Sequence, residues 1–178
     1  MARSGVERVV SGGQTGVDRA ALDAALEARV PVGGWCPRGR RAEDGRVPVK
    51  YPLKETAARS YAVRTEWNVR DSDGTLIVVL DDISSGTRLT LQTAQNQQKP
   101  CRVVHLWPAA SGELFSDGNS VNDQIESVVD WIRDHRIRVL NIAGPRGSSH
   151  RDVYPEARRF VSRLLQRLSD SEQGSGLS

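Results

Sequence analysis

The chain has few of the residues from which metal centres and several kinds of hydrolase site are built. It contains only two cysteines, Cys36 and Cys101, which lie far apart and form no C-x-x-C pair. This usage is typical of packed thiols in a reducing compartment. Its three histidines are scattered, and neither an H-E-x-x-H nor a G-x-S-x-G motif is present. No catalytic residue and no metal ligand is therefore predicted.

Long apolar runs and a strong charge of either sign are also missing. No run approaches the length of a membrane span, and the first residues form no apolar signal segment. The net charge is only +3, and arginines alternate with acidic residues along most of the chain, as on solvated surfaces. We expect a cytoplasmic protein with neither a membrane nor a nucleic acid among its partners.

What the sequence does contain is a glycine-rich segment, Ser11–Asp18 (SGGQTGVD), between an apolar run and a helical pattern. Its Gly-Gly-x-x-Gly spacing matches neither the P-loop nor G-x-G-x-x-G. Glycines allow a sharp turn and a close approach to a ligand, and the helix that follows points unpaired N–H groups into that turn. We interpret this glycine turn as an anion site, the alternative being a tight turn without a ligand. Gly13→Asp is expected to block the anion and leave the fold largely intact.

Apolar runs and helical patterns alternate along the chain, and 178 residues suit one domain. This alternation predicts an α/β fold, a single Rossmann-like doubly wound domain over residues 1–168 with a mostly parallel sheet and helices on both faces. The polar residues 169–178 are expected to be a flexible tail. The expected strands are 9–10, 30–35, 75–80, 101–106 and 137–142, and the expected helices are 17–29, 55–69, 87–98, 120–136 and 152–168.

The loops that follow the strands carry glycine, and two of them also carry arginine. In a doubly wound sheet such loops meet beyond the carboxyl ends of the strands, where ligands bind. Together they predict a cationic, amide-rich pocket for an anionic ligand. For Ser84–Thr87, a helix cap and an anion contact both remain open. The predicted binding residues are Gly12, Gly13, Gln14, Thr15, Gly16, Arg38, Arg40, Arg41, Gly86, Thr87, Gly144 and Arg146.

Five further features of the sequence are the segments 10–23, 34–45, 51–53, 64–75 and 140–146. In this order they resemble the molybdenum cofactor carrier family, and the resemblance covers nearly all of residues 7–168. The resemblance implies a fold similar to the Rossmann-like SLOG superfamily, of which this family is a circularly permuted branch. It further implies a homo-oligomer, a tetramer, that holds the molybdenum cofactor (molybdopterin), a phosphorylated pterin dithiolene carrying molybdenum. Molybdenum enzymes would be the recipients.

Two hypotheses follow. The first is a carrier that holds a phosphorylated or oxyanionic ligand without turnover, and the alternative is a SLOG-type hydrolase or sensor that acts on nucleoside monophosphates, with a nucleotide-like anion as ligand. Thr90 stands where phosphoribohydrolases of the superfamily have a catalytic glutamate, which favours the carrier, although Glu43, Glu66 or Asp73 could substitute. Ser85 also replaces the first of a usual glycine pair, where a positive φ would strain it.

Overall fold

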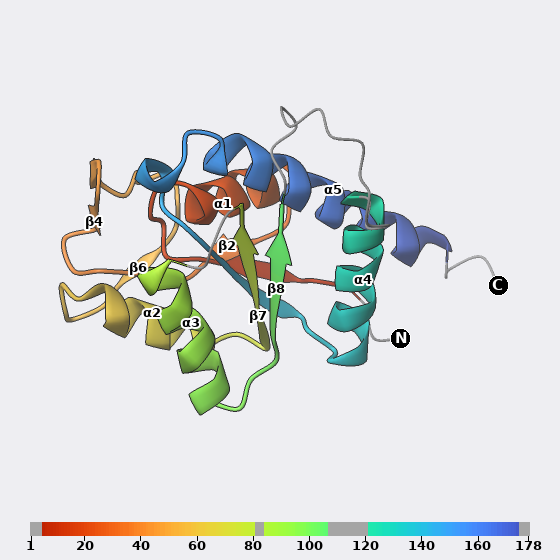
Figure 1. Cartoon of the computed structure of the whole chain (residues 1–178), viewed down its shortest axis with the longest axis horizontal. Coiled ribbons are helices and arrows are strands. Elements are labelled where there is room, and N and C mark those ends of the chain that lie inside the picture. Colours follow the sequence, from red (N-terminus) through yellow and green to blue (C-terminus); the bar gives the residue numbers. More distant parts are fainter. Residues whose placement is uncertain (1–4, 81–83, 107–120, 175–178) are drawn as a thin grey trace.

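A five-stranded parallel sheet forms the centre of the computed structural model, which describes residues 5–80, 84–106 and 121–174 (Figure 1). Every residue of β7 (Gly74–Val79), which lies between two other strands, is buried, because a parallel strand covered by helices on both faces favours a continuous apolar run. The strands lie in the order β2 (Val32–Gly33), β1 (Arg8–Val10), β9 (Val139–Ala143), β7 (Gly74–Val79) and β8 (Cys101–His105).

Helices cover both faces of this sheet (Figure 1). On one face α5 packs against both α1 and α4, and on the other face α2 packs against α3. The prediction of an α/β Rossmann-like fold with a mostly parallel sheet is confirmed. The helices are α1 (Val17–Glu27), α2 (Tyr61–Arg70), α3 (Ser85–Asn96), α4 (Val121–Asp134) and α5 (Val153–Gly174).

Small side chains explain the close packing of α1 between the sheet and α5. Ala20, Ala21, Ala24 and Ala25 form a buried stripe at helical spacing. Alanine lets a helix approach its neighbours closely, and its high helix propensity favours the helix itself. The glycine turn at the start of α1 is thereby fixed to the rigid centre of the domain.

Two boundaries near the start of the chain differ from the sequence prediction. The strand expected over 30–35 is divided in two, because Gly34 adopts a φ of 123° and turns the chain away after β2. The next strand, β3 (Trp35–Cys36), pairs with β6 (Lys54–Glu55) outside the main sheet. The helix expected from residue 55 begins only at Tyr61, where the Ser60 hydroxyl accepts a hydrogen bond from the Ala62 N–H.

The last helix runs to Gly174, so the first part of the segment expected as a flexible tail is helical. Contacts one turn apart continue the helix past Leu168, including a Gln166–Asp170 hydrogen bond. Arg167 also makes a bidentate pair with Glu126 on α4. Within the described ranges, no helix combines the length and the apolar character that crossing a membrane requires.

Candidate functional site

Two loops meet at the carboxyl ends of the neighbouring strands β1 and β9. The glycine turn follows β1, and the loop that follows β9 leads into a short 3-10 helix, η1 (Gly147–Ser149). The Gly147 N–H donates to the Thr15 hydroxyl over 3.0 Å, and the Val17 N–H donates to the Pro145 carbonyl over 3.2 Å. The structure therefore brings together the two glycine loops that the sequence placed at one edge of the sheet.

Close packing, and not only conformational freedom, requires the glycines of this turn. Gly13 has a φ of 74°, and a Cβ there would lie 2.7 Å from Leu53 Cδ1. Gly16 has a φ of 80°, and its Cβ would lie 2.5 Å from the Pro145 carbonyl oxygen. This geometry argues against the expectation that Gly13→Asp leaves the fold largely intact, because a side chain at this φ is strained and its Cβ meets the hydrophobic cluster beneath the turn.

An arginine from α2 lies over the first glycine of the turn. A Cβ at Gly12 would overlap the Arg64 guanidinium. Arg64 Nη1 donates to Asp18 Oδ2 over 3.2 Å, whereas Arg64 Nε is buried and has no hydrogen-bond partner. Nor do the amide N–H groups of Gly12 and Gly13 find an acceptor within residues 5–80, 84–106 and 121–174. The turn thus offers several donors that an anion could use.

The acidic partner of Arg64 is almost fully buried. The Asp18 side chain is only 3% exposed, and its Oδ2 also accepts a hydrogen bond from the Gln14 N–H. Burial raises the pKa of Asp18, and the charge of Arg64 opposes this change only in part. Asp18 therefore positions the Arg64 guanidinium at the glycine turn and partly offsets its charge.

Neither Arg64 nor Asp18 was among the predicted binding residues. The position of Asp18 in the first turn of α1 was a usable signal, since a carboxylate there faces the N–H groups of the helix start. Arg64 is the first residue of the matching segment 64–75, but its place at the turn was not predictable, because it lies 46 residues from Asp18 in the chain and reaches the turn only through the fold of α2.

The three predicted arginines of residues 38–41 have different environments. Arg40 is buried, and four of its five N–H donors bond to the backbone carbonyls of Val47, Pro48, Tyr51 and Leu53. It therefore anchors residues 47–53 instead of facing a ligand. Arg38 is exposed, and Arg41 lies over the Tyr61 ring, 5.0 Å from its centroid. Arg64 approaches the same ring, at 6.0 Å.

A hairpin of strands β4 (Arg41–Ala42) and β5 (Gly45–Arg46) reaches the glycine turn with two acidic side chains. Asp44 makes a bidentate pair with Arg19, with distances of 2.5 and 2.8 Å. The Glu43 carboxylate accepts hydrogen bonds from the Thr15 hydroxyl and from the N–H and hydroxyl of Ser148. Burial tends to raise the pKa of Glu43, but the hydrogen bonds from Ser148 and Thr15 outweigh it and lower the pKa.

The start of α3 forms a helix cap. The Ser84 hydroxyl accepts from the Thr87 N–H over 3.3 Å and lies 3.0 Å from the Thr87 hydroxyl. Gly86 is exposed with open space around it, and Ser85, the first helical residue, has no positive φ and is not strained. Asp81–Ile83, which begin this predicted loop, lie outside the described residues. Within the described part of the chain, no hydrogen bond or ion pair joins Gly86 or Thr87 to the glycine turn.

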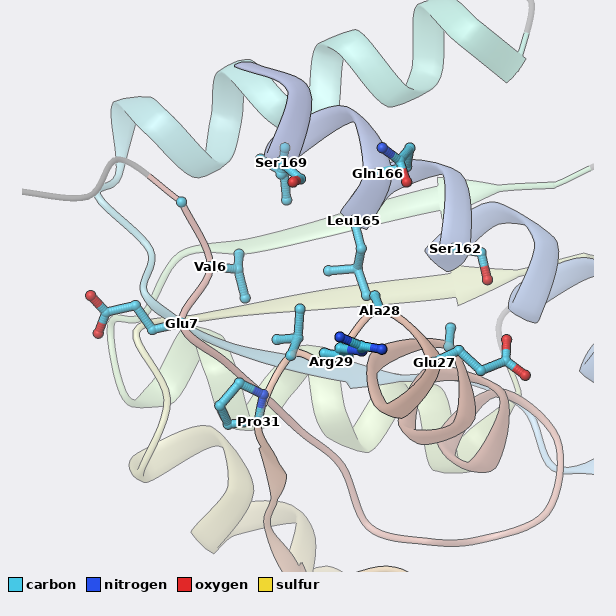
Figure 2. Close-up of a pocket in the computed structure, with 14 residues that line it drawn as sticks. Val6, Glu7, Glu27, Ala28, Arg29, Pro31, Ser162, Leu165, Gln166 and Ser169 are labelled. Atoms are coloured by element: carbon cyan, nitrogen blue, oxygen red, sulfur yellow. The ribbon is translucent and has the colours of Figure 1, made fainter. Parts of the chain in front are cut away.

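A cavity of about 810 Å³ lies at the opposite, amino-terminal end of β1 and β2 (Figure 2). Val6, Ala28, Pro31 and Leu165 line it, between the end of α1 and the side of α5. It contains none of the predicted binding residues. In the part of the chain that the structure describes, no group of three or more His, Cys, Asp or Glu side chains could hold a metal ion.

The parallel doubly wound sheet, with helices on both faces, defines a Rossmann-like protein, and glycine loops and an arginine lie at the carboxyl edge where such sheets bind ligands. The chain belongs to the circularly permutated YpsA SLOG family, whose model matches residues 9–165. It is similar to a solved structure named "Putative molybdenum carrier protein" from Syntrophus aciditrophicus SB, with 40% identity and a TM-score of 0.81 over 90% of this chain and 95% of the other. No curated protein matches the chain.

Proposed function

We propose that this protein binds and carries the molybdenum cofactor, or another phosphorylated or oxyanionic small ligand, at the glycine turn and does not turn it over. The observation that carries the proposal is the buried, unpartnered Nε of Arg64, whose guanidinium lies against Gly12 in the glycine turn. A buried donor without an acceptor is costly, and an anionic ligand would supply the acceptor. The name of the similar structure from Syntrophus supports molybdenum as part of the cargo.

The residues present fit the anionic part of that cofactor. Guanidinium and backbone N–H donors bind phosphate oxygens by charge-assisted hydrogen bonds. Arg64, Gly12 and Gly13 would hold one oxyanionic group, with Asp18 fixing the direction of the Arg64 fork. The cofactor brings its metal on its own dithiolene sulfurs, so the chain's residues would bind, orient and shield it.

The test is to purify the full chain natively from a host that makes the cofactor, and to measure pterin fluorescence and molybdenum content. The Arg64→Met variant is expected to lose most of both signals, whereas the surface control Arg133→Met on α4 retains them. Circular dichroism establishes that each variant is folded. Equal pterin and molybdenum in Arg64→Met and in Arg133→Met would contradict the proposed site, and their absence from the wild-type protein would contradict the proposed cargo.

A second function, hydrolysis of nucleoside monophosphates, is favoured by one observation. Two carboxyl groups flank the glycine turn, and their pKa values move in opposite directions, with Asp18 raised by burial and Glu43 lowered by its hydrogen-bond donors. Such a divergent pair is the usual basis for general acid and base roles. Incubation with nucleoside monophosphates and chromatography for released base decides between the functions, and release at enzymatic rates would replace the carrier proposal.

We also propose a cytoplasmic homo-oligomer, a tetramer, that delivers its cargo to molybdenum enzymes. Half-buried Trp35 and Trp67 support a protein interface, because they pack edge to face at 4.7 Å with Arg70 over Trp67. Tryptophan and arginine are the residues most enriched at the energetic centres of interfaces. Light scattering on the purified chain measures the assembly, and a monomeric mass at micromolar concentration would contradict the tetramer.

A further inference from the structure

The Glu43 carboxylate is held as an oxyanion of a ligand would be. The Thr15 hydroxyl and the Ser148 N–H donate to Oε1, the N–H over 3.1 Å. The Ser148 hydroxyl donates to Oε2 over 2.6 Å, and Arg146 Nε lies 3.8 Å from the same oxygen. Two hydroxyls, one backbone N–H and one guanidinium are the donor types that bind phosphate in proteins.

These donors come from elements that do not include the hairpin carrying Glu43. Thr15 belongs to the glycine turn after β1, whereas Arg146 and Ser148 follow β9. The Gly147 N–H joins the two loops by donating to the Thr15 hydroxyl, a link that does not involve Glu43. The carboxylate therefore sits in a preformed set of donors at the carboxyl edge of the sheet.

The hairpin divides into a base that packs in the protein interior and a tip that is held by polar contacts. At the base, buried Arg40 bonds to four backbone carbonyls, and Ala42 packs in a hydrophobic cluster. The tip is held by the Glu43 contacts, by the Glu43 N–H on Gln14 Oε1 and by the Asp44–Arg19 pair, most of which lie at the surface. Neither Glu43 nor Asp44 belongs to the hydrophobic cluster, so displacing the tip breaks side-chain contacts and leaves the packing of the base in place.

We propose that Thr15, Arg146 and Ser148 form an oxyanion subsite of the ligand site, and that the Glu43 carboxylate occupies this subsite as an internal competitor. A phosphate or molybdate group binds there by displacing the hairpin tip. This inference rests on the proposed function, because it assigns a second anionic group of the cargo to a place beside the one at Arg64. Competition by the hairpin then lowers the affinity of the subsite for anions and selects ligands with enough negative charge to replace a carboxylate.

The experiment titrates inorganic phosphate, and separately molybdate, into the full chain by isothermal calorimetry at low ionic strength. Glu43→Gln removes the competing charge and keeps the side chain's size, so we expect about tenfold tighter binding of both anions. Asp44→Asn is the matched control, because it loosens the same tip through Arg19 without removing the carboxylate from the subsite, and its gain in affinity is expected to be clearly smaller than that of Glu43→Gln. Adding Ser148→Ala to Glu43→Gln is expected to cancel the gain.

Each remaining outcome overturns the inference. An unchanged or weaker affinity in Glu43→Gln excludes competition by the carboxylate, and an equal gain in Asp44→Asn shows that loosening the tip is sufficient. If neither wild type nor Glu43→Gln binds phosphate or molybdate, the subsite does not exist. The proposed function fails separately, by loss of pterin and molybdenum from the wild-type chain, since that assay needs no inorganic anion. Thermal melts confirm that all variants are folded.

Discussion

At the scale of single residues, the site depends on a buried charge whose partner and surroundings come from distant parts of the chain. Arg64 and Asp18 are 15% and 3% exposed at the side chain, so water screens their interaction weakly. A buried ion pair adds little net stability, but removing one member leaves an uncompensated charge. The pair is therefore better explained by what it presents to a ligand than by what it adds to the fold.

Arg64→Met is expected to destabilise the protein by about 3 kcal/mol at neutral pH, because Asp18 loses its cation. The double variant Asp18→Asn/Arg64→Met is expected to recover most of that loss, since neither side chain is then charged. Urea unfolding measures both. A double variant no more stable than Arg64→Met would contradict the account of the pair.

The cost of Arg64→Met is also expected to depend on pH. Burial raises the pKa of Asp18 in the folded protein, so burial favours the protonated carboxyl group. The stability that this raised pKa contributes is present below the ordinary aspartate pKa, and it is lost as the pH rises through the raised value. The difference between wild type and Arg64→Met should shrink as pH falls from 7 towards 4. A pH-independent difference would show that Asp18 does not carry the effect.

Gly16 and Gly86 make a matched pair of glycine substitutions. Gly16→Ala is expected to cost about 2 kcal/mol, because φ is positive and the Cβ meets the Pro145 carbonyl. Gly86→Ala has open space in the first turn of α3 and is expected to change stability by less than about 1 kcal/mol, in the favourable direction. Thermal unfolding measures the stability of both variants, and similar stability changes in Gly16→Ala and Gly86→Ala would contradict the geometry of the glycine turn.

At the scale of elements, the β4–β5 hairpin and its supporting loop link the glycine turn to a second hydrophobic cluster. Leu22 from α1 and Tyr51 and Leu53 from the loop pack together beneath the turn. A long loop in a compact domain is often disordered or functional. Here buried Arg40 supplies the hydrogen bonds that a regular strand would otherwise make, and the loop stays ordered.

Arg40→Met is expected to lower the free energy of unfolding by about 3 kcal/mol and to expose residues 47–53 to proteolysis, because four carbonyls lose their donors. Arg38→Met, at an exposed neighbouring position, is expected to stay within about 0.5 kcal/mol of wild type. Limited proteolysis with mass spectrometry measures the effect. Equal protection of the loop in both variants would rule out the anchoring role.

The sequence predicted those elements whose local pattern agrees with their final environment. The apolar run of β7 and the alanine stripe of α1 are recognisable because burial on both faces of a strand, or on one face of a helix, leaves a fixed spacing. The boundary at Gly34 was not recognisable, since a glycine in a strand pattern does not reveal its φ. The helix past Leu168 was missed because polar residues can continue a helix once its first turns are packed.

The part of the candidate site that lies in loops directly after strands was predictable from the sequence. The loops after β1 and β9 meet as expected, because adjacent parallel strands deliver their following loops to one edge. Arg64 was left out of the predicted binding residues, because it comes from α2 and not from a loop that follows a strand. The role of Arg40 was not predicted, because the sequence does not show which carbonyls lie within reach of a guanidinium. For Ser84–Thr87 the sequence left a helix cap and an anion contact open, and the structure shows the cap, in which the Ser84 hydroxyl accepts a hydrogen bond from the Thr87 N–H.

At the scale of the whole molecule, the sheet separates two regions with different chemistry. Its carboxyl edge carries the glycine turn, Arg64 and the hairpin, whereas its amino edge carries the cavity beside α1 and α5 (Figure 2). Membership of the circularly permutated YpsA SLOG family is consistent with a ligand at the carboxyl edge, where open α/β sheets bind ligands. The central claim is thus that an anionic small molecule binds at this edge and leaves unchanged.

The most direct test of that claim is an unbiased mass spectrum of the small molecules extracted from natively purified full-length chain. We predict that the wild-type chain yields an intact phosphorylated pterin, and that Arg64→Met yields less of it than Arg133→Met. A spectrum in which the wild-type chain carries no phosphorylated or oxyanionic molecule, or carries one equally in both variants, would contradict it.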